Sequence, residues 1–203
     1  MRVYVATTNF GKLREMETLF GDGSFELASY ADYEDPIEGD TSYADNAALK
    51  ARALSAQLAR AGRPANVLAD DSGLEVYALD HRPGVLTAYF GGADLPWSER
   101  RRLLLEELAA APHGLTDRRA RFVSALHFID EQGREFAAMG TVDGEIALEE
   151  RGEAGFSFDP IFLHTPTGKT FAEMRGEEKN RVSHRAIAAA ALLAALRRAG
   201  VTG

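Results

Sequence analysis

The sequence contains no cysteine, a single tryptophan, and no apolar run close to the roughly 20 residues that span a bilayer. The lack of cysteine excludes thiol nucleophiles, disulfides and cysteine-ligated zinc or iron–sulfur sites. Because Met1 leads directly into the strand-like segment 2–6, we expect no signal peptide. These absences predict a cytoplasmic protein with no membrane partner.

Positive charge is also scarce, because 23 Lys and Arg residues stand against 31 Asp and Glu residues and the formal net charge is −8. Such a charge repels a long nucleic acid, and the basic residues form no long stripe, so we expect no nucleic-acid partner. A small anionic substrate would need a metal ion or a local cluster of Lys, Arg and helix N-termini. With 203 residues, of which 45% are hydrophobic, the chain is expected to form one domain over 1–203 with no independent second domain.

Hydrophobic periodicity indicates strand–helix units at both ends of the chain and a hairpin in the middle. We expect strands at 3–6, 66–69 and 161–163 and a hairpin within 119–146 that turns at 131–133. We expect helices at 12–20, from 96–98 through 108 and at 183–199, and a further helix that begins at a cap among 40–42 and ends near 62. This order of elements predicts a mixed α/β sheet flanked by helices.

The segment TTNFGK, from Thr7 to Lys12, predicts a turn that leads from a strand into a helix. Free N–H groups and the positive end of the helix dipole make such a turn suitable for phosphate, and Lys12 adds a full charge. A capped helix start with a solvated lysine is the simpler alternative.

Paired carboxylates occur in the segment DDSG, which contains Asp70 and Asp71 and follows the predicted strand 66–69. In α/β proteins ligands bind at the carboxyl ends of strands, and oxygen ligands of this kind suit Mg²⁺. A type I turn is an equally good interpretation of these residues. Glu38, Asn46 and Lys50 form a weaker candidate site. Asn46 and Lys50 lie four residues apart and so share one helix face, which in the alternative is simply solvated.

Two further segments, GFSFDP and KNRVSHR, combine aromatic and basic residues near the end of the chain. His184 and Arg185 fall in the first turn of a predicted helix, where the dipole opposes cations by about 0.3–1 kcal/mol each, and such violations are expected at functional sites. Phe156 and Phe158 can stack on a planar base, while Lys179 and the two basic residues donate hydrogen bonds to its edge. In the alternative, the phenylalanines lie in the core and the basic groups pair with nearby glutamates.

Together these segments resemble the inosine triphosphate pyrophosphatase family, the Ham1-like non-canonical purine NTP pyrophosphatases. The matching segments are 6–12 (ATTNFGK), 46–51 (NAALKA), 69–74 (ADDSGL), 83–85 (PGV), 120–122 (ARF), 158–162 (FDPIF), 168–170 (GKT) and 178–185 (EKNRVSHR). Each segment alone is a weak signal, but their order and spacing cover nearly the whole chain and make the match strong.

The resemblance implies an elongated mixed α/β fold with two lobes around a central active-site cleft, in a homodimer. It implies a Mg²⁺-dependent nucleoside-triphosphate pyrophosphohydrolase that converts ITP, dITP and XTP to the monophosphate and pyrophosphate. The implied ligands of Mg²⁺ are Glu38 and Asp71, and Asp71 also accepts a proton from the attacking water. The implied substrate-binding residues are Thr7, Thr8, Asn9, Phe10, Gly11 and Lys12 for the triphosphate, Ser72, and Phe156, Ser157, Phe158, Asp159, Lys179, His184 and Arg185 for the base.

Three departures from the family pattern affect this interpretation. Tyr89 stands where the family commonly has an arginine, and AGFSFD at 154–159 replaces a sequence close to GGFGYD. The segment EGDTSY at 38–43 places its glycine and threonine differently from the common pattern, although Glu38 still aligns when counted back from Asn46.

Two other functions remain open from the sequence. One is a pyrophosphatase of similar fold that acts on modified pyrimidine nucleotides, as Maf-like enzymes do, and the basic cluster at the last helix argues against it. The other is a sensor that binds purine triphosphates without hydrolysing them, and the carboxylates Glu38 and Asp71 argue against that.

Overall fold

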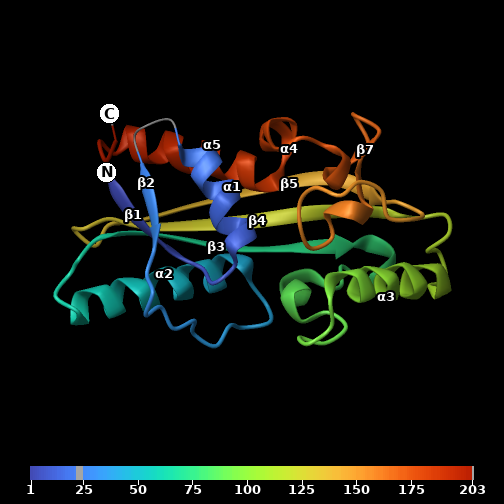
Figure 1. Cartoon of the computed structure of the whole chain (residues 1–203), viewed down its shortest axis with the longest axis horizontal. Coiled ribbons are helices and arrows are strands. Elements are labelled where there is room, and N and C mark those ends of the chain that lie inside the picture. Colours follow the sequence, from blue (N-terminus) through green and yellow to red (C-terminus); the bar gives the residue numbers. More distant parts are fainter. Residues whose placement is uncertain (22–24, 203) are drawn as a thin grey trace. The chain divides into compact units, whose positions relative to one another are not determined.

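The computed structural model describes residues 1–21 and 25–202 of the chain. Its strands form one sheet in the order β2-β1-β3-β4-β5-β6-β7, flanked by helices, which confirms the predicted mixed α/β fold (Figure 1). The strands are β1 (Arg2–Ala6), β2 (Glu26–Ser29), β3 (Asn66–Val76), β4 (Arg119–Ile129), β5 (Glu135–Ile146), β6 (Phe162–His164) and β7 (Lys169–Thr170). The helices are α1 (Phe10–Phe20), α2 (Tyr43–Arg60), α3 (Trp97–Ala110), α4 (Gly176–Val182) and α5 (His184–Arg198), and short 3₁₀ turns occur at Tyr77–Leu79, Gly84–Tyr89, Asp159–Ile161 and Phe171–Glu173.

The chain divides into two compact units, each assembled from separate segments. The first unit comprises Met1–Asp71, Ser124–Gly140 and His184–Gly203, and the second unit comprises Ser72–Val123 and Thr141–Ser183. Because the chain passes from one unit to the other several times, no single linker separates them, which explains why the sequence shows none.

In the first unit, β1 lies between β2 and β3 and is parallel to both. α1 and α5 cover one face of these strands and α2 covers the other, as Figure 1 shows. Consecutive side chains of β3 point to opposite faces of the sheet, since Leu68 packs with α1 and α5 while Val67 and Ala69 pack with α2. The buried strand therefore reads as a continuous apolar run.

The core of the second unit is rich in aromatic side chains. Phe122, Phe162 and Phe171 pack against one another, with ring centroids 4.6–5.8 Å apart. Leu104 and Leu108 of α3 are fully buried in the same core. β5, β6 and β7 pair in antiparallel fashion at this end of the sheet.

One predicted boundary is wrong, and one region contains a helix that was not predicted. The strand predicted at 66–69 continues to Val76, so the segment DDSG remains within the sheet, beyond Ala69, the last residue that pairs with β1. The type I turn alternative for that segment is therefore wrong. The helix predicted at 183–199 begins at His184, and an additional short helix, α4, ends just before Ser183, whose backbone is extended at φ −72° and ψ 154°.

Other expectations are confirmed. Among the three candidate caps at 40–42, Ser42 caps α2, and its side chain accepts a hydrogen bond from the backbone N–H of Asp45. The chain turns at 131–133 between β4 and β5. None of the helices within the described ranges is long and apolar enough to cross a membrane.

Candidate active site

The turn between β1 and α1 is organised by Asn9. Its Oδ1 accepts hydrogen bonds from the backbone N–H groups of Gly11 (2.9 Å) and Lys12 (3.2 Å), and the hydroxyl of Thr7 accepts one from the N–H of Asn9 at 3.1 Å. These caps use N–H groups that the sequence suggested were available for phosphate. Anion binding at this turn therefore depends more on the ammonium of Lys12 than on backbone donors.

Asp70 stands at the centre of a buried ionic cluster in the first unit. β1 ends at Ala6, which pairs with Ala69, so Asp70 lies just beyond the carboxyl end of β1. The Nζ of Lys12 lies 2.9 Å from Oδ2 of Asp70, and the hydroxyl of Ser124 donates to Oδ1 at 2.6 Å. The carboxylate of Asp70 is fully buried, so it fixes the ammonium of Lys12 at the entrance to α1.

Arg185 belongs to the same cluster. Its Nη2 lies 3.3 Å from Oδ2 of Asp70, and its Nη1 pairs with the carboxylate of Glu15 on α1. The guanidinium is only 1% exposed. Two carboxylates of the first unit hold this group, and donation from Arg185 to the base stays a prediction.

A second ionic group surrounds Asp71. The Nζ of Lys50 on α2 lies 3.1 Å from Oδ1 of Asp71 and 2.8 Å from Oε1 of Glu38. Asn46, one turn earlier on α2, donates to Oδ2 of Asp71 at 3.3 Å and exchanges two hydrogen bonds with the backbone of Gly39. Asn46 therefore fixes the loop that carries Glu38 beside Asp71, and the predicted face of α2 is buried rather than solvated.

The two adjacent carboxylates have opposite electrostatic environments. Burial alone would raise the pKa of Asp70, but the charges of Arg185 and Lys12 hold it well below its ordinary value. For Asp71, burial is the largest influence and raises the pKa, although Lys50 and Lys12 oppose it. Burial alone would lower the pKa of Lys50, but Asp71 and Glu38 raise it above its ordinary value. Asp70 is thus a fixed anion, and Asp71 is the better proton acceptor of the two.

The carboxylates of Glu38 and Asp71 suit a hard cation. Both carboxylates contact the ammonium of Lys50, so their oxygens lie near one common point. Two negative charges against one positive charge leave a net charge of about −1, which favours a bound cation. No group of three or more His, Cys, Asp and Glu side chains with metal-binding geometry occurs in the part of the chain that the structure describes. Two carboxylates are nevertheless sufficient for Mg²⁺, which completes its octahedron with water and phosphate oxygens.

The predicted base loop, residues 155–159, lies in the second unit. Oδ2 of Asp159 accepts hydrogen bonds from the backbone N–H of Phe156 and from Nζ of Lys179, both at 2.7 Å. The ammonium of Lys179 also lies 5.1 Å from the ring centroid of Phe156. Ser157 has a left-handed backbone, with φ 58°, at the position where the family commonly has glycine. The structure thus brings together Phe156, Asp159 and Lys179.

Phe158 does not have the predicted role of a stacking platform. Its side chain is fully buried, and its ring packs edge-on against Trp97 and Phe90 at 5.4 and 6.0 Å between centroids. It is a core residue of the second unit, as the alternative interpretation proposed. Phe156 is half-buried and remains the candidate for stacking.

The remaining predicted residues have the following positions. Phe10 is 77% exposed at the start of α1, and the hydroxyl of Thr8 donates to Asp35 at 3.1 Å. Ser72 is half-buried in β3, at the first position of the second unit. His184 is buried at the first position of α5, in the first unit.

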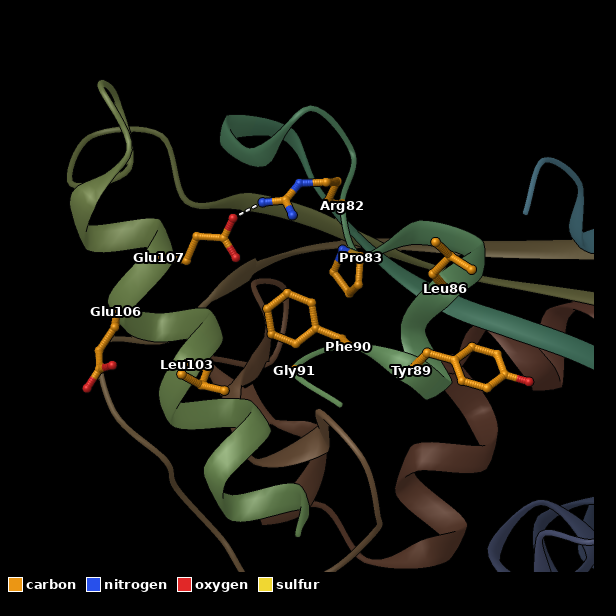
Figure 2. Close-up of a pocket in the computed structure, with 9 residues that line it drawn as sticks. All are labelled: Arg82, Pro83, Leu86, Tyr89, Phe90, Gly91, Leu103, Glu106 and Glu107. Atoms are coloured by element: carbon orange, nitrogen blue, oxygen red, sulfur yellow. Dashed lines mark ion pairs between the residues drawn. The ribbon is translucent and has the colours of Figure 1, made fainter. Parts of the chain in front are cut away.

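Tyr89, which replaces the family's arginine, lines an apolar pocket of about 590 Å³ in the second unit. Figure 2 shows Pro83 and Phe90 inside this pocket, while the hydroxyl of Tyr89 points away from Leu103 on α3. An ion pair between Arg82 and Glu107 lies at its rim. The lining is mainly hydrocarbon, so this pocket does not suit phosphate.

Sequence reasoning missed three residues that organise the site: Ser124, Glu15 and Arg101. Ser124 lies within the predicted hairpin at 119–146 without a distinguishing pattern, and Glu15 resembles any polar residue of an amphipathic helix. Arg101 on α3 donates from Nη1 to the carbonyl of Ser157 at 2.9 Å. These contacts span 54, 170 and 56 residues, respectively, and no local pattern signals them.

The fold and the site therefore define an α/β protein with a buried ionic cluster next to a candidate cation site. Residues 3–195 match the model of the Ham1 family, and the chain belongs to this family. It is 43% identical over 188 residues to the dITP/XTP pyrophosphatase of Exiguobacterium sp. (strain ATCC BAA-1283 / AT1b), and the match covers 91% of each chain. It is 44% identical over 198 residues to a dITP/XTP pyrophosphatase of Thermus thermophilus, and that match covers 96% of this chain and 91% of the relative.

Solved structures agree with the family assignment. The Ham1 protein of Coxiella burnetii superposes with a TM-score of 0.82 at 33% identity, covering 98% of this chain and 99% of the other. The Ham1 protein of Staphylococcus aureus gives a TM-score of 0.81 at 33% identity, covering 97% and 98%. The resemblance inferred from the motifs is therefore confirmed at the level of family and fold.

Proposed function

We propose that this protein hydrolyses non-canonical purine nucleoside triphosphates, namely ITP, dITP and XTP, to the monophosphate and pyrophosphate. The observation that carries the proposal is the pair Asp70–Asp71, in which one carboxylate anchors Lys12 and the other lies beside Glu38 and Lys50. The names of the relatives as dITP/XTP pyrophosphatases support the substrate class.

Lys12 and Lys50 bind the triphosphate in this proposal. Lys12 is held at the start of α1 by Asp70, and its side chain is 15% exposed, so its ammonium is preorganised but accessible. Positioning of this kind removes part of the entropic cost of binding a highly charged group. The turn formed by Thr7, Thr8, Asn9, Phe10 and Gly11 surrounds the same point.

Glu38 and Asp71 are the proposed ligands of Mg²⁺. When bound, the ion neutralises phosphate charge and stabilises the charge that develops on the leaving pyrophosphate. Lys50, which lies between the two carboxylates, keeps them close together and adds positive charge to the phosphate site.

Asp71 is the proposed general base. It accepts a proton from water while the water oxygen forms a bond to the α-phosphorus. The bond between the α-phosphorus and the bridging oxygen then breaks, and pyrophosphate leaves with the bonding electron pair. Asp70 does not take this role, because Lys12, Ser124 and Arg185 engage its oxygens.

Phe156 and Lys179 are the proposed contacts of the base, with Ser157 and Asp159 shaping the loop between them. Lys179 is a pure hydrogen-bond donor, so it suits the 6-oxo group of hypoxanthine or xanthine and opposes the 6-amino group of adenine. His184 and Ser72 remain proposed substrate contacts. Arg185 is omitted from this set because of its pairing with Asp70 and Glu15.

A homodimer in the cytoplasm is proposed as the working form of the enzyme. The dimer follows from the family resemblance, and the location is the one expected from the sequence. Size-exclusion chromatography with light scattering would test the dimer.

Product analysis is the decisive test of the function. The protein is incubated with Mg²⁺ and ITP, dITP, XTP, GTP, ATP or a modified pyrimidine triphosphate, and the products are separated by ion exchange. We expect IMP and pyrophosphate in equal amounts from ITP, and a kcat/KM for ITP at least about 10²-fold above that for ATP. IDP and orthophosphate as primary products would reject the mechanism. A preference for the pyrimidine substrate would favour a Maf-like enzyme, and tight binding without products would favour a sensor.

A further inference from the structure

The base loop of the second unit uses some of its own hydrogen-bond acceptors in internal contacts. Oδ2 of Asp159 already accepts from the N–H of Phe156 and from Nζ of Lys179. The carbonyl of Ser157 accepts from Nη1 of Arg101 at 2.9 Å. The loop therefore holds two of its acceptors in internal hydrogen bonds.

The direction of the Ser157 carbonyl is set by unusual backbone geometry. Ser157 and Gly155 are both left-handed, with φ of 58° and 75°. A Cβ atom at Gly155 would lie 2.2 Å from Oδ2 of Asp159, so only glycine allows this close approach. The loop conformation is thus fixed on both sides of Phe156, and Arg101 meets the carbonyl that results.

Arg101 is a costly residue at its position. Its side chain is 13% exposed, and its Nη2 pairs with Glu150 at 2.9 Å. Its Nε is buried and has no hydrogen-bond partner among residues 1–21 and 25–202. A buried donor without a partner destabilises a fold, so fold stability alone does not account for this arginine.

We propose that Arg101 is a specificity-determining positioning residue of the base site. By fixing the Ser157 carbonyl toward its own guanidinium, it keeps this acceptor from turning toward the exocyclic amino groups of guanine and adenine. Hypoxanthine lacks such a group and xanthine carries a second oxo group, so neither base loses a contact. This inference rests on the proposed function, and it explains how the altered loop rejects guanine.

Arg101→Met tests the proposal, because it keeps the length and apolar stem of the side chain but removes every donor. Steady-state kcat/KM is measured for ITP, XTP, GTP and ATP. We expect the ratio of kcat/KM for ITP to that for GTP to fall by about 10-fold or more, mainly through a gain on GTP. Arg101→Lys, which retains a donor, should preserve most of the ratio.

Two matched controls separate this role from general damage. Arg102→Met makes the same change one residue later on α3, where the guanidinium pairs only with Glu99 and Glu106 among the contacts of the described residues. Glu150→Gln removes the ion pair of Arg101 but leaves its bond to Ser157. Neither control should change the ratio of ITP to GTP.

The outcomes distinguish this inference from the proposed function. If Arg101→Met lowers kcat/KM for all four substrates by the same factor, Arg101 is only structural and the proposal is wrong. If wild type hydrolyses none of them, the proposed function fails, and the inference is then tested by calorimetric binding of IMP and GMP. In that experiment, Arg101→Met should lower the ratio of the affinity for IMP to the affinity for GMP. An unchanged ratio of affinities overturns the inference. Arg101→Gln, too short to hold the carbonyl, replaces Arg101→Met if that variant does not fold.

Discussion

The ionic cluster of the first unit and the base loop of the second unit use different interactions to position their functional groups. The cluster joins side chains that are far apart in sequence, such as Glu15 and Arg185 or Asp70 and Ser124, through buried charges. The base loop is held mainly by short-range hydrogen bonds, left-handed backbone and the aromatic anchor Phe158. Arg101 and Lys179 reach it from distant segments through hydrogen bonds, and Trp97 and Phe90 do so through ring contacts with Phe158.

This difference predicts how each region responds to change. A buried charge that loses its partner is strongly destabilising, so the members of the cluster depend on one another. A loop held by local hydrogen bonds and backbone conformation can change shape with a smaller effect on the fold. We therefore expect the cluster to set the rate and the stability, and the loop to set the choice of base.

The largest expected effect is at Asp71. Asp71→Asn removes both the proposed base and a proposed metal ligand, while the side-chain volume is nearly unchanged. We expect kcat on ITP to fall by about 10²–10⁴-fold or more, with little change in Tm because Glu38 still pairs with Lys50. Asp45→Asn, an exposed change on α2, is the control and should be silent. A variant that keeps a tenth of wild-type kcat would move the catalytic role elsewhere, first to Asp70.

Arg185→Met should show the next largest effect, and mainly in stability. It leaves Asp70 and Glu15 without their shared guanidinium, so we expect the free energy of unfolding to fall by roughly 3–5 kcal/mol. Urea denaturation measures this, and Arg198→Met, in the exposed last turn of α5, is the matched control.

The same variant also tests the comparison between the two regions. Where Arg185→Met remains folded, the ratio of kcat/KM for ITP to that for ATP should be unchanged, because the guanidinium faces carboxylates and not the base. A collapse of that ratio would show that Arg185 reads the base after all, and would restore the prediction made from the sequence.

The sequence predicted the members of each region better than their partners. Strand and helix periodicity located β1, α1 and α2, and the motifs selected Lys12, Lys50 and Asp71, which the structure places in two ionic groups around Asp70 and Asp71. Periodicity is a local property, so it could not show that β3 continues through DDSG beyond its pairing with β1. The position of Arg185 in the first turn of a helix indicated a special site but not which acceptors its guanidinium contacts.

Aromatic residues of the base loop show the same limit. The pattern F-x-F does not tell a core phenylalanine from one that stacks on a ligand, since both are apolar and adjacent to polar residues. Packing against Trp97 and Phe90 decides the case for Phe158, and these partners lie 61 and 68 residues earlier in the chain. Such pairings come from the tertiary fold alone.

Lys179→Met should have an intermediate effect, confined to the base. It removes the proposed donor to a 6-oxo group, so we expect kcat/KM for ITP to fall by about 10- to 100-fold while that for ATP changes little. Lys169→Met, which removes an exposed lysine paired with Glu178 in the same unit, is the control. An equal loss on ITP and ATP would mean that Lys179 supports the fold of the loop and does not read the base.

The smallest expected effect is at Ser157, where the loop departs from the family's glycine. A left-handed serine is strained, whereas glycine adopts this conformation freely but loses more entropy on folding, so the two effects partly cancel. We expect Ser157→Gly to raise the free energy of unfolding by no more than about 1 kcal/mol. The ratio of kcat/KM for ITP to that for GTP should be unchanged, because the carbonyl that Arg101 contacts keeps its direction. Ser157→Ala separates the contributions, since it removes the hydroxyl but keeps the strained Cβ and should give no gain. The opposite result would be a lower free energy of unfolding for Ser157→Gly and an unchanged one for Ser157→Ala. It would show that the Cβ atom of Ser157 packs in the loop and that backbone strain does not govern this region.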